Sequence, residues 1–342
     1  MAGIEDVAKL AGVSTATVSR ALSGKNSVSA KAKAKVENAA RELNYTASAS
    51  AYTLATGRTR NIGVVMPFVD RWFFSVILEG IETELIDHGY DLTLYNLSGG
   101  LEQRRKIFFE FVNRKRVDAF IAVAVKPTED ELKQLAIAGI PILGLGGPIP
   151  GARTVAVDET NAGKVATQHL IDLGHTRIAI ISGTIGQEME FHQPNLRRQG
   201  YLEALKAADL SVKATWLAEA DFTMAGAYIE GKKLLQDRGS APTAIFAASD
   251  EMAIGVIMAA RDLGLSVPKD VSIIGMDNHD LADFFGVTTI SQSARAQGTN
   301  AAKHVIELLD RLDPNQPVNI EENEEWPIEL VVRTSTAAPT QK

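Results

Sequence analysis

The chain has 342 residues, of which 45% are hydrophobic and 23% charged, the composition of an ordinary globular protein with two or three domains. It contains no cysteine, which excludes a disulfide framework, a thiolate metal site and a cysteine nucleophile. No apolar run approaches the roughly 20 residues that span a bilayer. The first residues carry acids where a secretory signal peptide carries bases, so we expect a cytoplasmic protein.

The formal net charge of −7 is unevenly distributed along the chain. Residues 1–60 hold nine of the 35 Lys and Arg residues and four of the 42 Asp and Glu residues, which leaves 26 bases and 38 acids in the remainder. A small basic head on an acidic body predicts that the head contacts a polyanion such as nucleic acid. A solvated helix surface is the alternative explanation of the same charge.

Residues 4–22 predict two short helices separated by a turn. Apolar residues recur at helical spacing on both sides of the turn: Ile4, Val7, Ala8, Ala11, Val18, Ala21 and Leu22. Gly12 suits a turn with positive φ, and Ser14 is a good N-cap for the second helix. A third helix follows Ser29. It closes a small core with its own apolar residues, Val36, Ala39, Ala40 and Leu43.

This is the helix-turn-helix arrangement, whose second helix enters the major groove of DNA. The residues outside the apolar face of that helix are mostly short: Thr15, Ala16, Thr17, Ser19 and Arg20. Hydroxyl groups reach phosphates, methyl groups contact thymine, and arginine binds guanine. An ordinary helical hairpin would explain the apolar spacing, but not the cap, the turn and the charge together.

The stretches DVAKLAGVSTATVSRALSG, VSAKAKAKVENAARELNY and LATGRTRNIGVVMP resemble the LacI/GalR family of bacterial transcription regulators. The likeness continues through HLIDLGHTRIAIISG, RRQGYLEAL, VPKDVSIIGMDN and ELVVRTST, and so covers essentially the whole chain. It implies that Thr15, Ala16 and Arg20 read bases, with thymine or DNA shape read at Ala16. It places four hydroxyl residues at phosphate contacts: Ser14, Thr17, Ser19 and Ser29.

The resemblance divides the head into a DNA-binding domain, residues 1–43, and a hinge, residues 44–60. A family hinge becomes helical on the operator and inserts a leucine, here Leu54, into the central base step. A lone segment of this length should not stay helical in water. The hinge departs from the family pattern at three positions, Ala47, Ser50 and Tyr52. Weaker contact between two hinge helices is the expected result; the alternative for Leu54 is an ordinary linker leucine.

From residue 61, buried strands alternate with amphipathic helices, which predicts a doubly wound α/β body with mostly parallel sheets. The expected strands are NIGVVMP, DLTLYN, AFIAVAV, IPILGLG, RIAIIS, TAIFAAS and VSIIGMD. The resemblance implies two subdomains within residues 61–336, joined by three crossovers, as in periplasmic sugar-binding proteins. By it, residues 61–160 with about 292–322 form the first subdomain, and residues 161–291 with 323–336 form the second.

Ligands of doubly wound folds bind beyond the carboxyl ends of the strands, here in the cleft between the two halves. The residues expected to hold a small effector there are Phe73, Phe74, Gly146, Arg197, Phe222, Ser249, Asp277 and Gln292. The aromatic rings would stack on the ligand, and Arg197 would hold two of its oxygens. The alternatives are a core role for the aromatic rings and an ion pair between Arg197 and a carboxylate, for which Asp277 would serve.

Polar anchors are fewer than in a typical monosaccharide pocket of the family. Gly146 stands where many relatives place an aspartate, Ser249 replaces a frequent asparagine, and Val123 lies in an apolar strand end. A carbohydrate-type effector is the first expectation. A larger or less hydroxylated ligand, or none, stays open, as does the choice between induction and corepression.

The sequence carries no catalytic signature. GLGGPIPG at residues 144–151 is not a dinucleotide fingerprint because Pro148 and Pro150 prevent a helix from starting there. A periplasmic sugar carrier would have no use for the basic head, and a sugar enzyme would need a catalytic constellation in the cleft. We therefore expect a regulator, most simply a repressor that binds a pseudo-palindromic operator as a homodimer, without cofactor, metal or membrane.

Overall fold

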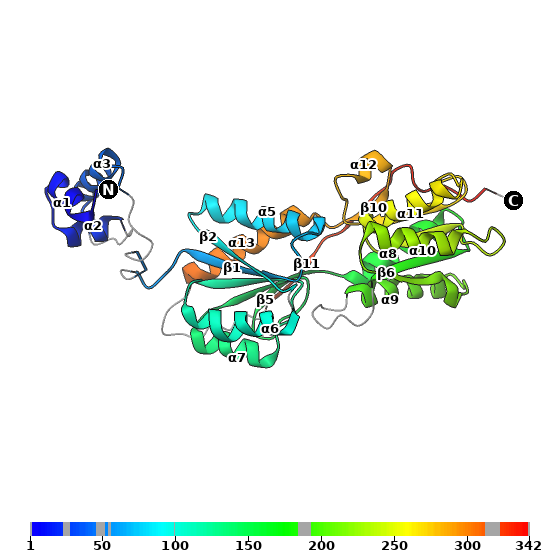
Figure 1. Ribbon diagram of the computed structural model, residues 1–342, viewed down its shortest axis with the longest axis horizontal. Coiled ribbons are helices and arrows are strands. Elements are labelled where there is room, and N and C mark those ends of the chain that lie inside the picture. The colour runs from blue at the N-terminus through cyan, green and yellow to red at the C-terminus, as the bar shows by residue number, and fades with distance from the viewer. Residues whose placement is uncertain are drawn as a thin grey trace.

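The computed structural model describes residues 2–22, 28–45, 52–53, 56–98, 100–183, 193–311 and 322–340. In these ranges, three helices form an N-terminal head, and two six-stranded sheets with helices on both faces form the body. Figure 1 shows the head beside the first sheet, with the second sheet at the opposite end of the molecule. The expected architecture, a small all-α head on two α/β subdomains, is confirmed.

The head consists of α1 (Ile4–Ala11), α2 (Thr15–Leu22) and α3 (Ala30–Glu42). Gly12 ends α1 with φ of 67°, the left-handed conformation that the turn requires. The Ser14 hydroxyl accepts the backbone N–H of Thr17 at 3.2 Å, and Ser29 caps α3 in the same way. The core residues are Val7, Ala8, Ala11, Val18, Ala21, Val36, Ala39 and Ala40. The turn, the caps and the apolar spacing are as predicted.

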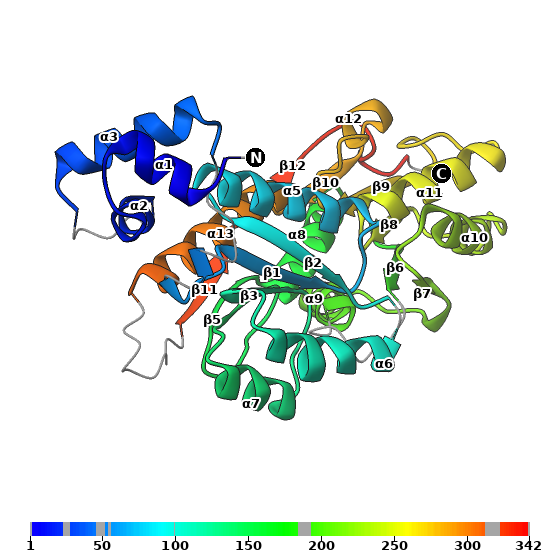
Figure 2. The same cartoon turned by 60° about the vertical axis from the view of Figure 1, so that its left-hand side comes forward.

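The first sheet is parallel throughout, in the order β11-β5-β4-β3-β1-β2. Its strands are β1 (Asn61–Met66), β2 (Asp91–Asn96), β3 (Ala119–Val123), β4 (Ile142–Leu145), β5 (Arg153–Val157) and β11 (Glu322–Trp326). α5 (Trp72–Asp87) and α13 (Ala294–Arg311) cover one face. The other face is covered by α6 (Gly100–Arg105), a π-helical turn (Lys106–Phe111), a 3-10 turn (Val112–Arg114) and α7 (Glu129–Ala138), as Figure 2 shows for α6 and α7.

The second sheet has the order β12-β10-β9-β8-β6-β7, and only its edge strand β12 is antiparallel. Its strands are β6 (Ile178–Gly183), β7 (Leu217–Ala220), β8 (Ala244–Ala247), β9 (Ser272–Met276), β10 (Thr288–Ser291) and β12 (Glu329–Val331). α8 (Glu159–Asp172) and α9 (Gln193–Ala207) pack on one face. α10 (Met224–Leu235) and α11 (Asp250–Asp262) pack on the other, and a 3-10 turn (Ala214–Trp216) and the short α12 (Ala282–Phe285) complete this half.

The chain crosses between the two sheets three times in its described part, after β5, after β10 and after β11. The first two crossings lie close to the positions expected from the sequence. The third differs, because β11 pairs in register with β5 and so belongs to the first sheet through Trp326. The expected boundary between residues 322 and 323 is therefore wrong. β11 pairs with β5 from Glu322 to Trp326, so the chain crosses to the second sheet only after Trp326.

Two glycines allow α8 and α9 to approach each other closely. A Cβ atom on Gly163 of α8 would overlap the Arg197 carbonyl oxygen, and one on Gly200 of α9 would overlap the Thr160 carbonyl oxygen. Backbone therefore meets backbone at this helix crossing. The contact holds the second turn of α9 against the first turn of α8, where both helices border the space between the two sheets.

We expect Gly200→Ala to lower the free energy of unfolding by about 1–3 kcal/mol because the added methyl overpacks this crossing. That loss exceeds the roughly 1 kcal/mol that alanine gains over glycine as a helix former. The matched control is Gly231→Ala in α10, where the nearest neighbour of the new Cβ is the Ala259 Cβ at 3.2 Å. Urea unfolding followed by circular dichroism measures both, and equal midpoints for the two variants would contradict the close-packing argument.

Candidate functional site

One face of α2 is free of the core of the head. Val18 and Ala21 point into that core, whereas Thr15, Ala16 and Arg20 are exposed. Ser14 and Ser29 are also exposed, while Thr17 and Ser19 are half-buried. The residues expected to contact DNA therefore lie at or near the surface at the start of α2 and of α3. Their hydroxyls can still donate to a phosphate while Ser14 and Ser29 accept from their helices.

The linker is fastened to the body at its C-terminal end. The Asp118 carboxylate accepts the backbone N–H groups of Thr59 and Arg60 at 2.7 and 2.9 Å, and the Thr59 hydroxyl at 2.9 Å. The Arg60 Nε donates to the Tyr52 hydroxyl at 2.9 Å, with the guanidinium over the Tyr52 ring. The expected wedge residue Leu54 lies outside the described residues, as do Ala47 and Ser50.

A cavity of about 320 Å³ lies between the two sheets, at the carboxyl ends of their strands. All eight residues expected to hold an effector line it, namely Phe73, Phe74, Gly146, Arg197, Phe222, Ser249, Asp277 and Gln292. The volume is in the range of pockets for small metabolites. Residues far apart along the chain thus meet here, because both sheets point their carboxyl ends at the same space.

Aromatic rings form the wall contributed by the first subdomain. Phe68 and Phe74 meet edge to face with centroids 5.9 Å apart, and Phe73 and Phe74 with centroids 5.6 Å apart. Phe222 lines the cavity from the second subdomain, and its ring lies so close to Gly183 that a Cβ there would overlap it. These rings present flat apolar surface to a ligand from both sides of the space.

The backbone turns sharply where several strands enter the cavity. Ala124, Phe222 and Asp277 have φ of 50°, 57° and 110°, and Gly146 has φ of 111°. Positive φ costs a non-glycine residue of order 1 kcal/mol or more, and such residues concentrate at functional sites. Gly146 is therefore explained by its backbone conformation, and its carbonyl oxygen accepts Gln193 Nε2 at 3.3 Å.

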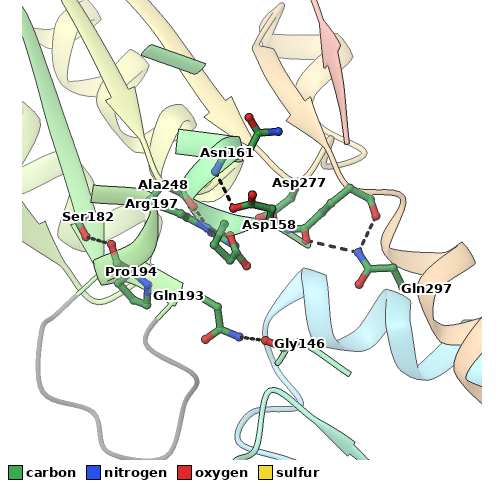
Figure 3. Close-up of polar contacts among 12 residues, drawn as sticks. Gly146, Asp158, Asn161, Ser182, Gln193, Pro194, Arg197, Ala248, Asp277 and Gln297 are labelled. Atoms are coloured by element: carbon green, nitrogen blue, oxygen red, sulfur yellow. Dashed lines mark hydrogen bonds and ion pairs between the residues drawn. The ribbon is translucent and has the colours of Figure 1, made fainter. Parts of the chain in front are cut away.

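Arg197 lines the cavity, but its guanidinium is held by the protein. Its Nε and one terminal nitrogen donate to the two Glu159 carboxylate oxygens at 2.6 and 3.1 Å, and the other terminal nitrogen donates to the Ala248 carbonyl at 2.6 Å. Figure 3 shows Arg197 reaching toward Ala248, with Asp277 beyond it. Of the two roles considered for Arg197, the ion pair with a carboxylate is present, and the carboxylate is that of Glu159.

Asp277 is the most perturbed acid with a side chain at the cavity. Burial raises the pKa of its carboxyl to about 7, against the opposing effects of the Arg197 charge and of a hydrogen bond from Gln292. That bond runs from Gln292 Nε2 to Oδ1 at 2.7 Å, and Gln297 Nε2 donates to the Gln292 carbonyl at 2.6 Å. Figure 3 shows this chain of side chains leading from Asp277 to Gln297 on α13. It connects the second subdomain to the first.

Several lining residues were missed by sequence reasoning, among them Arg71, Glu159, Gln193, Glu251 and Gln297. Glu159 stands directly after the strand-ending Asp158, in the first turn of α8, so a strand-end search would have found it. Gln193, Glu251 and Gln297 lie on helices and Arg71 directly precedes one, and there the sequence gives no sign of which face meets the cleft.

We expect the Asp277 carboxyl to make the folded chain less stable as the pH rises. The raised pKa of Asp277 means that the folded state keeps a proton that the unfolded state releases near its ordinary pKa of about 4. The stabilisation is fully present below about pH 4 and is lost as the pH rises through about 7. Between those limits, the melting temperature of the wild type should fall relative to that of Asp277→Asn. The exposed variant Asp91→Asn should follow the wild type, and parallel curves for wild type and Asp277→Asn would contradict the assignment.

In the described ranges, no three side chains of His, Cys, Asp or Glu are grouped so that they could hold a metal ion. Nor is any described helix both long enough and apolar enough to cross a membrane.

Comparison with known proteins agrees with this geometry. The model of bacterial regulatory proteins of the lacI family matches residues 3–48, and that of the periplasmic binding protein-like domain matches residues 167–336. The HTH-type transcriptional repressor PurR of Vibrio vulnificus is 37% identical over 317 residues, which are 90% of this chain and 92% of the relative.

Solved structures give the same result. The lac repressor dimer bound to operator and the anti-inducer ONPF has a TM-score of 0.81 at 26% identity, covering 98% of this chain and 99% of the other. A LacI family regulator from Enterococcus faecium with bound ribose has a TM-score of 0.69 at 28% identity, covering 81% and 99%. The chain therefore belongs to the LacI family of bacterial regulatory proteins.

Proposed function

We propose that the protein is a transcriptional repressor that binds a pseudo-palindromic operator as a homodimer. A small metabolite that enters the cavity between the subdomains lowers or raises its affinity for the operator. The observation that carries the proposal is one chain with both parts: a helix-turn-helix head with exposed short side chains on α2, and a cavity at the carboxyl ends of two sheets. Such a protein acts on DNA in the cytoplasm.

The reading of DNA is assigned to α2. Arg20 suits bidentate contact with guanine, the Thr15 hydroxyl suits a base edge, and the Ala16 methyl suits thymine. Phosphate contacts that fix the register fall to the four hydroxyl residues Ser14, Thr17, Ser19 and Ser29. Leu54 is proposed to wedge the central base step, a role that its place in the linker sequence supports.

The response to an effector is assigned to closure of the cavity. Three crossings join the subdomains, and the Asp277–Gln292–Gln297 chain bridges them, so a ligand that contacts both halves changes their relative angle. The first subdomain carries the linker on Asp118, which passes the change to the head. A ligand acts in this way only if its affinity differs between the two arrangements.

A carbohydrate-type effector is supported by the aromatic walls and by the acceptor and amide groups of Asp277, Gln193 and Gln292. The ribose bound to the Enterococcus faecium regulator is a precedent in the family. We propose no catalytic step, because none of the charged groups that line the described part of the cavity is arranged as a nucleophile with a base.

Arg20→Ala is expected to remove operator preference. An operator is first enriched from random DNA with the wild-type protein, and binding to it and to unrelated DNA is then measured by fluorescence anisotropy. Loss of a guanine contact should cost about 1–3 kcal/mol on the operator and little on unrelated DNA. Arg41→Ala removes the same charge from α3 and is the matched control. An unchanged operator preference in Arg20→Ala would refute the base-reading role.

Phe222→Ala is expected to abolish the effector response. A panel that includes D-ribose and cellobiose is screened by thermal shift, where a ligand at 100 times its Kd stabilises the protein by roughly 2.7 kcal/mol. A hit is then tested for its effect on operator binding. Val332→Ala, at a 59% exposed position, should respond as the wild type does. A full response in Phe222→Ala would place the effector outside this cavity.

A further inference from the structure

The cavity is lined by more carboxylates than cations. Its described charged residues are Arg71, Glu159, Arg197, Asp221, Glu251 and Asp277. Two guanidinium groups thus face four carboxyl groups. Metabolites that carry phosphate or carboxylate need positive charge or several strong donors in their pocket, so the state of the two arginines decides which ligands fit.

Arg197 is already neutralised. All three nitrogens of its guanidinium donate to the Glu159 carboxylate or to the Ala248 carbonyl. The Arg197 and Glu159 side chains are each 8% exposed. Opening a buried pair of this kind is unfavourable because it leaves a buried charge without its partner. An anionic ligand would have to compete with Glu159 for Arg197 and then lie beside the Glu159 carboxylate.

Arg71 is also accompanied by acids. One of its terminal nitrogens lies 3.5 Å from the Asp221 carbonyl, and its guanidinium lies over the Phe68 ring. The Asp221 carboxylate accepts the Thr223 N–H at 3.2 Å and the Thr223 hydroxyl, and these bonds lower its pKa, so it is ionised. The charge of Arg71 in turn opposes the rise in the pKa of Glu251 that burial causes.

Asp277 adds an acceptor without a cation bonded to it. Its hydrogen-bond donor is the neutral amide of Gln292. Even with protons on both Asp277 and Glu251, the carboxylates of Glu159 and Asp221 balance the two arginines. The described lining therefore offers no net positive charge at any protonation state near neutrality.

We propose that the cavity accepts an uncharged or cationic ring compound that donates hydrogen bonds, such as a free sugar or an amino sugar, and rejects phosphorylated and carboxylated metabolites. Glu159 imposes this selectivity as a positioning residue, because it occupies the guanidinium that would otherwise receive an anion. The inference rests on the proposed function in one respect, that this cavity holds the effector.

The absence of cysteine from the chain allows a direct test that needs no known ligand. Gln193→Cys places a single thiol in the cavity lining. Ser211→Cys places one at an exposed position in the loop that follows α9. Each is labelled with a cationic and with an anionic methanethiosulfonate of similar size. The ratio of the two rates cancels the reactivity of the thiol itself and reports the local potential.

We expect the cationic reagent to be favoured about 10-fold at position 193 relative to position 211, as for a potential of roughly one to two kT. Glu159→Gln in the Gln193→Cys background should reduce that preference at least about threefold, while Glu82→Gln on the exposed face of α5 should not change it. An equal or greater rate for the anionic reagent at position 193, or no effect of Glu159→Gln, would overturn the proposal.

Matched ligands test the same rule by thermal shift: glucose, glucosamine and glucose 6-phosphate, and ribose with ribose 5-phosphate. Within each set, any stabilisation should be confined to the members without phosphate. Stabilisation by a phosphorylated member that Phe222→Ala removes would overturn the charge rule. If none of these sugars stabilises the protein while the cationic reagent is still favoured at position 193, the result would instead count against the carbohydrate effector of the proposed function.

Discussion

The ion pair between Glu159 and Arg197 is the interaction on which the second half of the cavity depends. It joins the first turn of α8 to the second turn of α9 and, through the Ala248 carbonyl, to the end of β8. Gly163 and Gly200 permit the backbone approach that brings the two side chains together. A buried pair contributes little net stability compared with apolar packing, but it tolerates few geometries. Its main effect here is to fix the position and the charge of one cavity wall.

The first subdomain builds its wall by a different means. There the aromatic rings of Phe68, Phe73 and Phe74 pack on one another, and strand ends with positive φ at Ala124 and Gly146 turn the chain away from the space. The first wall is thus rich in aromatic rings held by packing, and the second, apart from Phe222, is mainly polar and held by directed bonds. A ligand that contacts both must be amphipathic, which describes a ring with a hydrophobic face and polar edges.

Sequence reasoning recovered the features that local chemistry determines. The head core, Gly12 and the serine caps follow from helical spacing and turn residues, and seven of the described strands follow from apolar runs. Strands β5, β7, β10, β11 and β12 were missed, and β7, β11 and β12 among them are edge strands. ENEEW of β11 is almost entirely polar, and only its pairing with β5 makes it a strand. Strand ends and the family resemblance together indicated the eight cavity residues. The partner of Arg197 could not be read in the same way, since Glu159 and Asp277 are equally plausible until the α8–α9 crossing is known.

The clamp at Asp118 sets the point at which the linker is anchored to the body. With Thr59 and Arg60 fastened, the tether to the head is anchored at these residues rather than at the first strand. In a homodimer, the second head binds its half-site as an intramolecular event, at an effective concentration that falls as the tether lengthens. Releasing the clamp would add slack to both tethers and weaken bivalent binding without altering any contact to DNA. A carboxylate far from the bases thereby helps to set the affinity for paired half-sites.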